Sequence, residues 1–313
     1  MSLRSTGASP ERRAVLIGLI GEGVTPSLTP PMHEREGARH GMPYVYRTID
    51  LDPAEATPDA VEGLLASAQR LGFDGLNITH PIKQTILPLL DELSPAARRV
   101  GAVNTVVFDG GRRIGHNTDV TGFGQAFDEA IGAGPHGTVV LVGAGGAGAA
   151  VATALAERDI AELVIVDLDA RRAGELASAV DAASRPSVRA AAPDALAAEL
   201  AAADGVVNAT PFGMAAHPGT AFDPALLEPR LWVADIVYRP VETALLAEAA
   251  ARGCRVMPGL GMAMGQAADA FEIFTGETAD RRAMLADLRD LVAAEAAAAS
   301  ADSRRLHRRE EEQ

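Results

Sequence analysis

Glycines with phosphate-binding spacing lie in the middle of this sequence. Gly143, Gly145 and Gly148 directly follow the apolar run 139–142, and an Ala- and Leu-rich segment, 149–157, comes after them. This pattern predicts a strand, a tight turn and a helix whose free N–H groups can bind a pyrophosphate. The candidate cofactor loop therefore comprises Gly143, Ala144, Gly145, Gly146, Ala147 and Gly148.

A carboxylate follows the next predicted strand. Asp167 ends the apolar run 163–166, roughly 20 residues past the glycines, where such folds place the acid that binds the adenosine ribose. A carboxylate there repels a 2′-phosphate and favours NAD over NADP. Arg171 and Arg172 keep NADP open, because a guanidinium can pair with that phosphate or stack on adenine. The acid can instead cap the following helix, and methyltransferases carry a similar loop and acid.

Composition narrows the class of protein. With 313 residues, 48% of them apolar, the chain is long enough for two domains with their own cores. Its net charge of −14 argues against nucleic-acid binding, which needs a basic face. No apolar run reaches the roughly 20 residues that span a bilayer, so we expect a cytoplasmic protein without membrane contact. The single cysteine, Cys254, cannot form an internal disulfide, and none of the seven histidines has metal-ligand spacing to another ligand, so no metal site is expected.

Alternating strands and helices must position these residues. In the first half the pattern predicts strands at 14–20, 44–50 and 75–78, with helices from 30 to about 40 and over 59–71. This alternation implies a parallel sheet covered by helices, with ligands at the carboxyl ends of the strands. Further along we expect a helix at 95–100, a hairpin of 105–109 with 112–116, and a helix that runs from 117–119 to about 131.

The second half continues the alternation. Beyond the glycine loop we expect helices at 170–180, 194–201 and 241–252, and strands at 188–191, 205–208, 231–235 and 255–257, which complete a Rossmann-like half. A last helix, 280–299, has apolar residues three to four apart. The polar segment 1–13 and the charged tail 300–313 are expected to be disordered.

Polar residues gather after the predicted strands of the first half. The segment from Asn77 to Lys83 carries an amide, a hydroxyl, an imidazole and an ammonium within seven residues. Asn117 and Asp119 enter the helix after the hairpin, where they serve either as capping residues or in chemistry. His80 is expected to support the site at most, because not every side chain of its loop can point inward.

In their order along the chain, these segments resemble the shikimate dehydrogenase family, and most closely its NAD-dependent quinate/shikimate dehydrogenase branch. The matching segments are 18–33 with Ser27-Leu28-Thr29-Pro30, 75–83, 101–105, 115–122, the glycine loop, 208–214, 235–240 and 259–276. Such an ordered set is far more specific than any one motif. The resemblance implies a two-domain α/β fold, with an N-terminal substrate-binding sheet domain, a Rossmann-like dinucleotide-binding domain and a cleft between them.

The resemblance also implies a reaction, the transfer of a hydride between the ring hydroxyl of quinate or shikimate and NAD, giving 3-dehydroquinate or 3-dehydroshikimate. This oxidation needs a proton acceptor beside the cofactor, because the hydroxyl proton leaves as the hydride departs. The family uses a Lys and Asp pair, which corresponds here to Lys83 and Asp119. An ammonium shielded from water can relay a proton while a carboxylate holds it in place. Such enzymes serve either the shikimate pathway of aromatic amino acid biosynthesis or quinate catabolism.

Other site residues carry over from the family by position. The substrate carboxylate would be held by the hydroxyls of Ser27, Thr29 and Tyr238. The ring hydroxyls would bond, besides Lys83, to Asn77, Thr79, Asn104, Asp119 and Gln266. Besides the glycine loop and Asp167, the implied cofactor residues are Arg172, Asn208, Ala209, Thr210, Val237, Gly259 and Met262.

Two positions depart from the usual family pattern. Thr29 stands where most shikimate dehydrogenases have Ser, which resembles the quinate-using branch, and Ala263 follows Met262 where Leu is usual. Because Gln266 must return to the first half, we expect a discontinuous substrate domain, 14–125 plus 259–299, around a cofactor domain of 126–258. We expect a monomer or homodimer. Three alternatives stay open: an NADP-dependent biosynthetic shikimate dehydrogenase, an S-adenosylmethionine-dependent methyltransferase and a non-catalytic ligand-binding relative.

Overall fold

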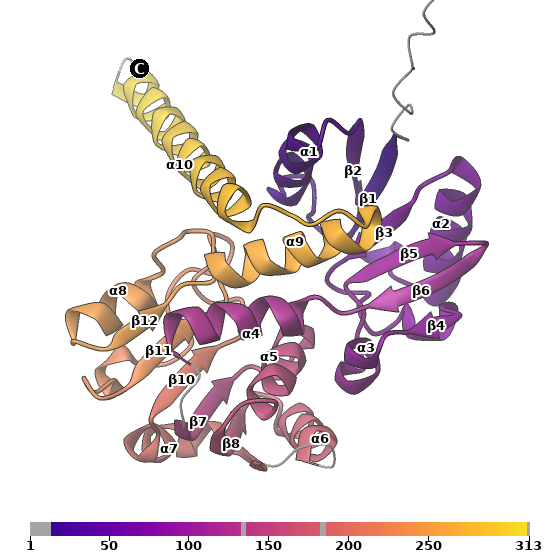
Figure 1. Ribbon diagram of the computed structural model, residues 1–313. Helices are drawn as coiled ribbons and strands as arrows, with labels where there is room; N and C mark the ends of the chain where they lie inside the picture. Colours follow the sequence, from indigo (N-terminus) through magenta and orange to yellow (C-terminus); the bar gives the residue numbers. More distant parts are fainter. Residues whose placement is uncertain (1–13, 133–135, 182–185, 312–313) are drawn as a thin grey trace, which may run out of the picture.

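The computed structural model of the chain describes residues 14–132, 136–181 and 186–311. In these residues the chain forms two six-stranded sheets. Figure 1 shows helices beside each sheet and two helices, α4 (Asp119–Ala130) and α9 (Leu260–Thr275), side by side between them. The expected disorder of residues 1–13 and 312–313 lies outside the described residues.

The first sheet has the strand order β2-β1-β3-β5-β6-β4. Its strands are β1 (Val15–Gly21), β2 (Tyr44–Asp50), β3 (Gly75–Ile78), β4 (Glu92–Leu93), β5 (Thr105–Asp109) and β6 (Arg112–His116). The parallel pairing predicted for the first three strands is confirmed, and so is the hairpin of β5 and β6. That hairpin joins β3 in the antiparallel sense, which makes the sheet mixed.

Helices of the first half begin close to the predicted residues. They are α1 (Thr29–Arg39), α2 (Pro58–Leu71) and α3 (Pro95–Val100), with short 3-10 turns η1 (Pro53–Glu55) and η2 (Leu87–Leu89). Thr57 and Ser94 cap α2 and α3 by accepting a backbone N–H with their hydroxyls. In the register of the parallel strands, Gly21 pairs with Asp50 and Ile20 with Ile78, so the loops that follow β1 and β3 leave the sheet at the same edge.

The second sheet is parallel throughout, in the order β12-β11-β10-β7-β8-β9. Its strands are β7 (His136–Val142), β8 (Ile160–Val166), β9 (Ser187–Ala191), β10 (Gly205–Asn208), β11 (Trp232–Asp235) and β12 (Arg255–Met257). Its helices are α5 (Gly146–Ala156), α6 (Ala170–Asp181), α7 (Leu196–Ala202) and α8 (Ala244–Ala251), with 3-10 turns η3 (Pro193–Ala195) and η4 (Pro224–Leu226). Asn208 pairs with both Val142 and Asp235, so three strand ends meet at one edge.

Several predicted boundaries were wrong. The helix expected at 194–201 is split into η3 and α7, and the helix expected at 241–252 starts only at Ala244, because the Thr243 hydroxyl accepts the Leu246 N–H and caps it there. The last helix, α10 (Arg281–Glu311), continues to Glu311, so residues 300–311 are helical where a disordered tail was expected.

The chain returns to the first sheet through α9. Leu260, Met264 and Phe271 pack in the apolar cluster of β1 and β2, whereas Met262 packs in the cluster of β7 and β8. Helix α9 crosses α4 where Gly122 and Gly265 face each other. A Cβ on Gly122 would lie 2.6 Å from the Gln266 backbone nitrogen. One helix therefore contacts the cores of both sheets.

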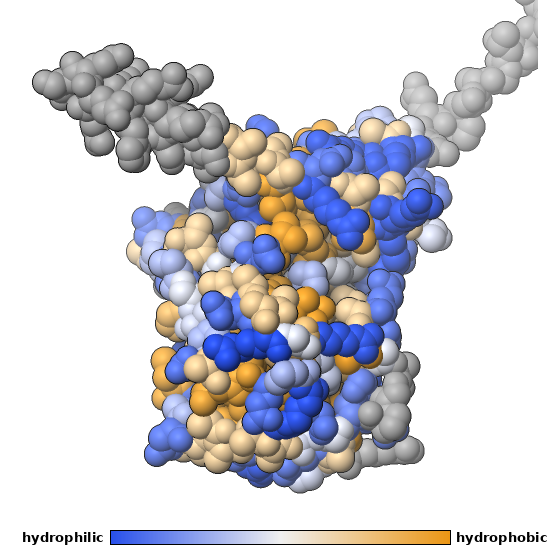
Figure 2. Space-filling model, turned by 90° about the vertical axis from the view of Figure 1, so that its left-hand side faces the viewer, coloured by the Kyte–Doolittle hydropathy of each residue, from blue (hydrophilic) through white to orange (hydrophobic). Residues whose placement is uncertain are grey.

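Among the described residues, the exposed large apolar side chains are those of Val45, Leu71, Leu168, Phe212 and Met214. Figure 2 shows hydrophilic residues interspersed with apolar ones over one face of the molecule. Within residues 14–132, 136–181 and 186–311, no helix is long and apolar enough to cross a membrane. The same residues contain no group of three or more His, Cys, Asp or Glu side chains that could hold a metal ion.

Candidate active site

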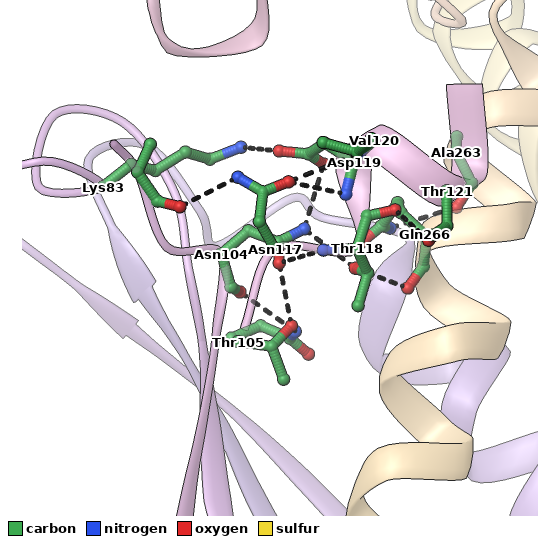
Figure 3. Close-up of polar contacts among 12 residues, drawn as sticks. Lys83, Asn104, Thr105, Asn117, Thr118, Asp119, Val120, Thr121, Ala263 and Gln266 are labelled. Atoms are coloured by element: carbon green, nitrogen blue, oxygen red, sulfur yellow. Dashed lines mark hydrogen bonds and ion pairs between the residues drawn. The ribbon is translucent and has the colours of Figure 1, made fainter. Parts of the chain in front are cut away.

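Lys83 and Asp119 form an ion pair between the two sheets (Figure 3). The ammonium Nζ of Lys83 lies 2.7 Å from Oδ2 of Asp119, and the two side chains are 19% and 8% exposed. Lys83 belongs to the turn after β3, where its carbonyl accepts the Val103 N–H at 2.8 Å. Asp119 is the first residue of α4. A strand end and a helix start thus bring together two residues 36 positions apart.

The carboxylate of Asp119 is held from a second side. Its Oδ1 accepts a hydrogen bond from Asn104 Nδ2 at 3.0 Å. The side-chain Oδ1 of Asn117 accepts the backbone N–H groups of Asp119 and Val120 at 3.1 and 3.3 Å, and its Nδ2 donates to the Ala102 carbonyl. Asn117 therefore caps α4, one of the two roles considered for it. This cap holds the backbone of Asp119, from which the carboxylate extends.

The Asn104 amide is fully used within the protein. It is 3% exposed, donates to Thr118 Oγ1 and Asp119 Oδ1, and accepts from the Thr118 N–H and the Thr105 hydroxyl. Asn77 lies behind it, donating to the Asn104 carbonyl and to Thr105 Oγ1. The structure thus connects both predicted amides to the pair, but a substrate hydroxyl can bond to Asn104 only by replacing one of these partners.

Gln266 reaches the same place from α9. The Thr118 hydroxyl donates to the Gln266 carbonyl at 2.9 Å, and the Gln266 amide donates to the Ala263 carbonyl one turn earlier. The Gln266 side chain is half-buried and Figure 3 shows it beside the start of α4. Because this contact spans 148 positions, the return of α9 is what adds Gln266 to the site.

The hydroxyls predicted to bind the substrate carboxylate belong to Ser27, Thr29 and Tyr238. Ser27 Oγ accepts the Thr29 N–H at 3.2 Å, and Thr29 starts α1. Tyr238 follows β11 but packs against the apolar cluster of β1 and β2. Burial raises the pKa of the Tyr238 hydroxyl, while the charge of the adjacent Arg239 opposes that shift. Thr79 is half-buried after β3, and its methyl group contacts the backbone at Gly21.

The glycine loop has the geometry expected of a phosphate-binding turn. Gly143 has a φ of +108°, a region that L side chains rarely adopt, and a Cβ on Gly148 would lie 2.1 Å from the Gly143 carbonyl oxygen. Gly145 precedes α5 and has open space around its missing side chain. Backbone N–H groups at the start of α5 have no acceptor within the helix, so the turn can hold a pyrophosphate.

Asp167 contacts that loop directly. Its Oδ2 accepts the Ala144 N–H at 2.7 Å and its Oδ1 accepts the Asp169 N–H at 2.8 Å. Asp169, not Asp167, caps α6, since it accepts the N–H groups of Arg171 and Arg172. The alternative that Asp167 serves as the helix cap was therefore wrong. The Arg172 side chain is 61% exposed, and its Nε lies 3.6 Å from Oδ2 of Asp169.

A buried carboxylate, Asp235, holds several residues that were predicted to bind the cofactor. Asp235 accepts the Asn208 amide at 2.9 Å, the Val237 N–H at 3.0 Å and the Thr243 hydroxyl at 2.7 Å. Burial raises the pKa of the Asp235 carboxyl, and these hydrogen bonds oppose that shift. Asn208 in turn accepts the N–H and hydroxyl of Thr210 at 3.0 and 2.7 Å. These roles of Asp235 and Thr243 were not predicted from the sequence.

Other residues predicted to bind the cofactor are Ala209, Gly259 and Met262. Ala209 contacts the glycine loop, since a Cβ on Gly143 would lie 2.8 Å from the Ala209 carbonyl. A Cβ on Gly259 would lie 2.4 Å from the Ile236 carbonyl, beside Val237. Met262 is buried in the core shared with α4.

The ion pair and the glycine loop meet at Lys83. A Cβ built on Gly146 would lie 3.8 Å from Cδ of Lys83, so the lysine stem lies against the glycine loop. Lys83 is also the only lysine in the chain, and arginine supplies the other 27 of its 28 Lys and Arg residues. Of these cations, only an amine can release a proton near neutral pH. Counting lysines would have singled out this residue without any motif.

Comparisons with known proteins agree with this geometry. Residues 19–106 match the model of the shikimate dehydrogenase substrate binding domain, and residues 259–289 match that of the shikimate 5'-dehydrogenase C-terminal domain. A shikimate dehydrogenase (NADP(+)) of Pseudarthrobacter chlorophenolicus is 53% identical over 93% of this chain and all of its own length. A quinate/shikimate dehydrogenase (NAD(+)) of Corynebacterium efficiens is 50% identical over 87% of this chain and 97% of its own.

A solved structure extends the likeness to three dimensions. Quinate dehydrogenase from Corynebacterium glutamicum in complex with NAD superimposes with a TM-score of 0.83 and 48% identity, covering 88% of this chain and 99% of that one. The two sheets, the arrangement of the lysine and carboxylate, and relatives that match almost end to end lead to one conclusion. The chain belongs to the shikimate dehydrogenase family.

Proposed function

We propose that the protein is an NAD-dependent quinate/shikimate dehydrogenase, which oxidises a ring hydroxyl to give 3-dehydroquinate or 3-dehydroshikimate. The observation that supports this most strongly is the 2.7 Å contact between Lys83 Nζ and Asp119 Oδ2, with the lysine stem against Gly146 of the glycine loop. Proton transfer and cofactor binding then occur at one place. Relatives near 50% identity carry this activity in their names.

NAD, when bound, accepts the hydride from the ring carbon. Lys83, in its amine form, takes the hydroxyl proton as the hydride leaves, and Asp119 holds the amine in place and stabilises the ammonium that results. Asn104 fixes the Asp119 carboxylate from the opposite side at 3.0 Å. The pair is mostly shielded from water, which strengthens the interaction of the two charges.

Substrate and cofactor are divided between the two sheets. We assign the substrate carboxylate to Ser27, Thr29 and Tyr238, and the ring hydroxyls to Asn77, Thr79, Asn104, Asp119 and Gln266. Ser27 and Thr29 follow β1, and Tyr238 packs against the apolar cluster of β1 and β2. Asn77, Asn104, Asp119 and Gln266 lie within one network of hydrogen bonds that includes the lysine. The glycine loop, with Asn208, Ala209, Thr210, Val237, Gly259 and Met262 beside it, is assigned to NAD.

Cofactor preference depends on Asp167. Its carboxylate lies at the end of β8, bonded to the glycine loop at Ala144, where a negative charge disfavours a 2′-phosphate. A second candidate is the NADP-dependent biosynthetic enzyme, because relatives at 52 and 53% identity are named shikimate dehydrogenase (NADP(+)). Arg171 and Arg172 do not favour it, since both guanidinium groups lie within 4 Å of the Asp169 carboxylate.

Initial rates of nicotinamide reduction test the proposal, with quinate and with shikimate, each offered NAD and then NADP. Turnover of both acids with NAD and little with NADP is expected. Turnover of shikimate alone with NADP would support the biosynthetic alternative. Binding of either acid without turnover under any condition would contradict both and leave the non-catalytic relative, while the methyltransferase alternative has no support in a member of this family.

We also propose the organisation around this site. The substrate domain comprises 14–125 plus 259–299, and the cofactor domain 126–258; the packing of α9 with β1 and β2 supports the discontinuous boundary. The protein acts in the cytoplasm as a monomer or homodimer. Sedimentation equilibrium distinguishes the two assemblies, and cell fractionation tests the compartment.

A further inference from the structure

Arg239 connects parts of the molecule that are distant in sequence. It follows Tyr238 in the loop between β11 and α8, and its side chain is 26% exposed. Its Nη1 donates to the Pro26 carbonyl at 3.0 Å, across 213 positions. Its Nε and Nη2 donate to the two carboxylate oxygens of Glu295 on α10, with Nε at 2.8 Å. The guanidinium is thus oriented by α10 and directed at the loop after β1.

The bond to Pro26 fixes the peptide group that leads into Ser27. The carbonyl of this peptide accepts from Arg239, and its N–H, which belongs to Ser27, donates to the Val24 carbonyl at 2.9 Å. Holding both ends of one peptide sets the direction in which the Ser27 side chain leaves the backbone. Upstream, Asp50 holds the same loop through the N–H groups of Gly23 and Thr25.

The same guanidinium neighbours Tyr238, another of the residues assigned to the substrate carboxylate. Its positive charge lowers the pKa of the Tyr238 hydroxyl, and the negative charge of Glu295 raises that pKa. Arg239 therefore touches the loop of Ser27 and neighbours Tyr238, although the two come from different sheets.

We propose that Arg239, oriented by Glu295, is a positioning residue for the carboxylate of the substrate, aligning the hydroxyls of Ser27 and Tyr238 on one anionic group. The inference rests on the proposed function and assigns a specificity role to a residue that is not itself assigned to substrate or cofactor. Arg239 acts on recognition of the acid, not on the proton transfer at Lys83.

The test compares Arg239→Ala with the wild-type protein on quinate and shikimate and on their methyl esters. For the two acids, KM is expected to rise about tenfold or more while kcat changes less than about threefold, the pattern of lost binding that is equal in ground and transition state. KM for NAD should stay unchanged. For the esters, which lack the negative charge, the rise in KM should be much smaller. A residue that merely holds the fold would weaken acids and esters alike.

Arg189→Ala is the matched control, because the Arg189 guanidinium is also held by carboxylates, those of Glu199 and Glu162, but on the edge strand β9. Its KM values should equal those of the wild type. Arg239→Lys keeps one donor for the Pro26 carbonyl and should give an intermediate KM for the acids; it also replaces Arg239→Ala should that variant fail to fold.

The outcomes separate the inference from the function it rests on. Wild-type turnover of the acids with unchanged KM in Arg239→Ala and Arg239→Lys would overturn the inference alone. An equal rise in KM for acids and esters would overturn it as well. Absence of wild-type turnover with either acid would overturn the proposed function and the inference together.

Discussion

At the scale of single residues, the asparagines of the site act as fixed supports. Asn104 and Asn208 each use both donors and the acceptor of the side chain on protein groups, around Asp119 in one case and Asp235 in the other. Such fully bonded amides lose little further freedom when a ligand binds, so the carboxylates beside them are preorganised.

Asp167 carries a first prediction at this scale. Asp167→Asn keeps a side-chain oxygen for the Ala144 N–H but removes the charge that repels a 2′-phosphate. The ratio of kcat/KM for NAD to that for NADP should fall about tenfold, or roughly 1.4 kcal/mol. Asp128→Asn is the control, because Asp128 forms an ion pair with Arg158, which precedes β8. This variant should leave the ratio unchanged. An unchanged ratio in Asp167→Asn would show that this carboxylate does not set cofactor preference.

His33 carries a second prediction, on pH. Complete burial lowers its pKa to about 3, among the rings of Tyr44, Tyr46 and Phe271. Unfolded, the imidazole has a pKa of about 6.5, so between these values the unfolded state binds more protons and stability falls as pH falls. From pH 7 to pH 5 this residue should cost about 2 kcal/mol of unfolding free energy.

Urea denaturation of the wild type and His33→Phe at pH 7 and pH 5 measures this effect. The variant loses the contact with the Tyr44 hydroxyl at both pH values, so only the difference between the two pH values isolates the titration. The wild type should lose about 2 kcal/mol more than the variant on acidification. Parallel losses would mean that the imidazole does not stay neutral in the folded protein.

At the scale of elements, the crossing of α4 and α9 brings Asp119 and Gln266 together. Gly122 and Gly265 face each other there, and a Cβ on Gly265 would lie 2.9 Å from the Gly122 Cα. The two backbones approach so closely because neither helix has a side chain at the crossing. The Thr118 bond to the Gln266 carbonyl depends on this approach.

Gly122→Ala should therefore separate the helices. The added methyl group would overlap backbone atoms of α9, which costs about 1 to 3 kcal/mol and lowers kcat by displacing Asp119. Gly63→Ala in α2 is the matched control, since nothing lies within 4 Å of its Cβ, and it should stabilise the fold by up to about 1 kcal/mol. Thermal unfolding and initial rates measure both effects. Equal stability and rates in the two variants would contradict the role of the crossing.

Most elements were predictable from sequence because local patterns determine them. Alternating apolar strands and helices with Gly or Pro at their ends gave β1 to β3, the hairpin and the parallel second sheet. Local patterns failed where a contact distant in sequence or a single cap decides the boundary. Thr243 delays α8, and β4 exists only through its pairing of Glu92 and Leu93 with Ile114 and Gly115 on β6.

At the scale of the whole molecule, the site is assembled where the two sheets meet. The ordered motifs predicted which residues belong to the site. They did not predict which residues those side chains contact. Arg239 contacts Pro26 and Glu295 only because α10 packs near the loop after β1. Lys83 contacts Gly146 only because the two sheets lie together. Such contacts join segments 56 to 213 positions apart, a range over which sequence patterns carry no signal.

Replacing the chain's single lysine by arginine tests the central claim, that Lys83 transfers the hydroxyl proton. Lys83→Arg keeps a positive charge beside Asp119 but cannot release a proton near neutral pH. With quinate and NAD, kcat should fall about 10² to 10⁴-fold while the thermal midpoint stays close to that of the wild type. Arg35→Lys, in an ion pair with Asp287, exchanges the same two cations and should leave kcat unchanged. A kcat for Lys83→Arg within a few-fold of the wild-type value would contradict the account.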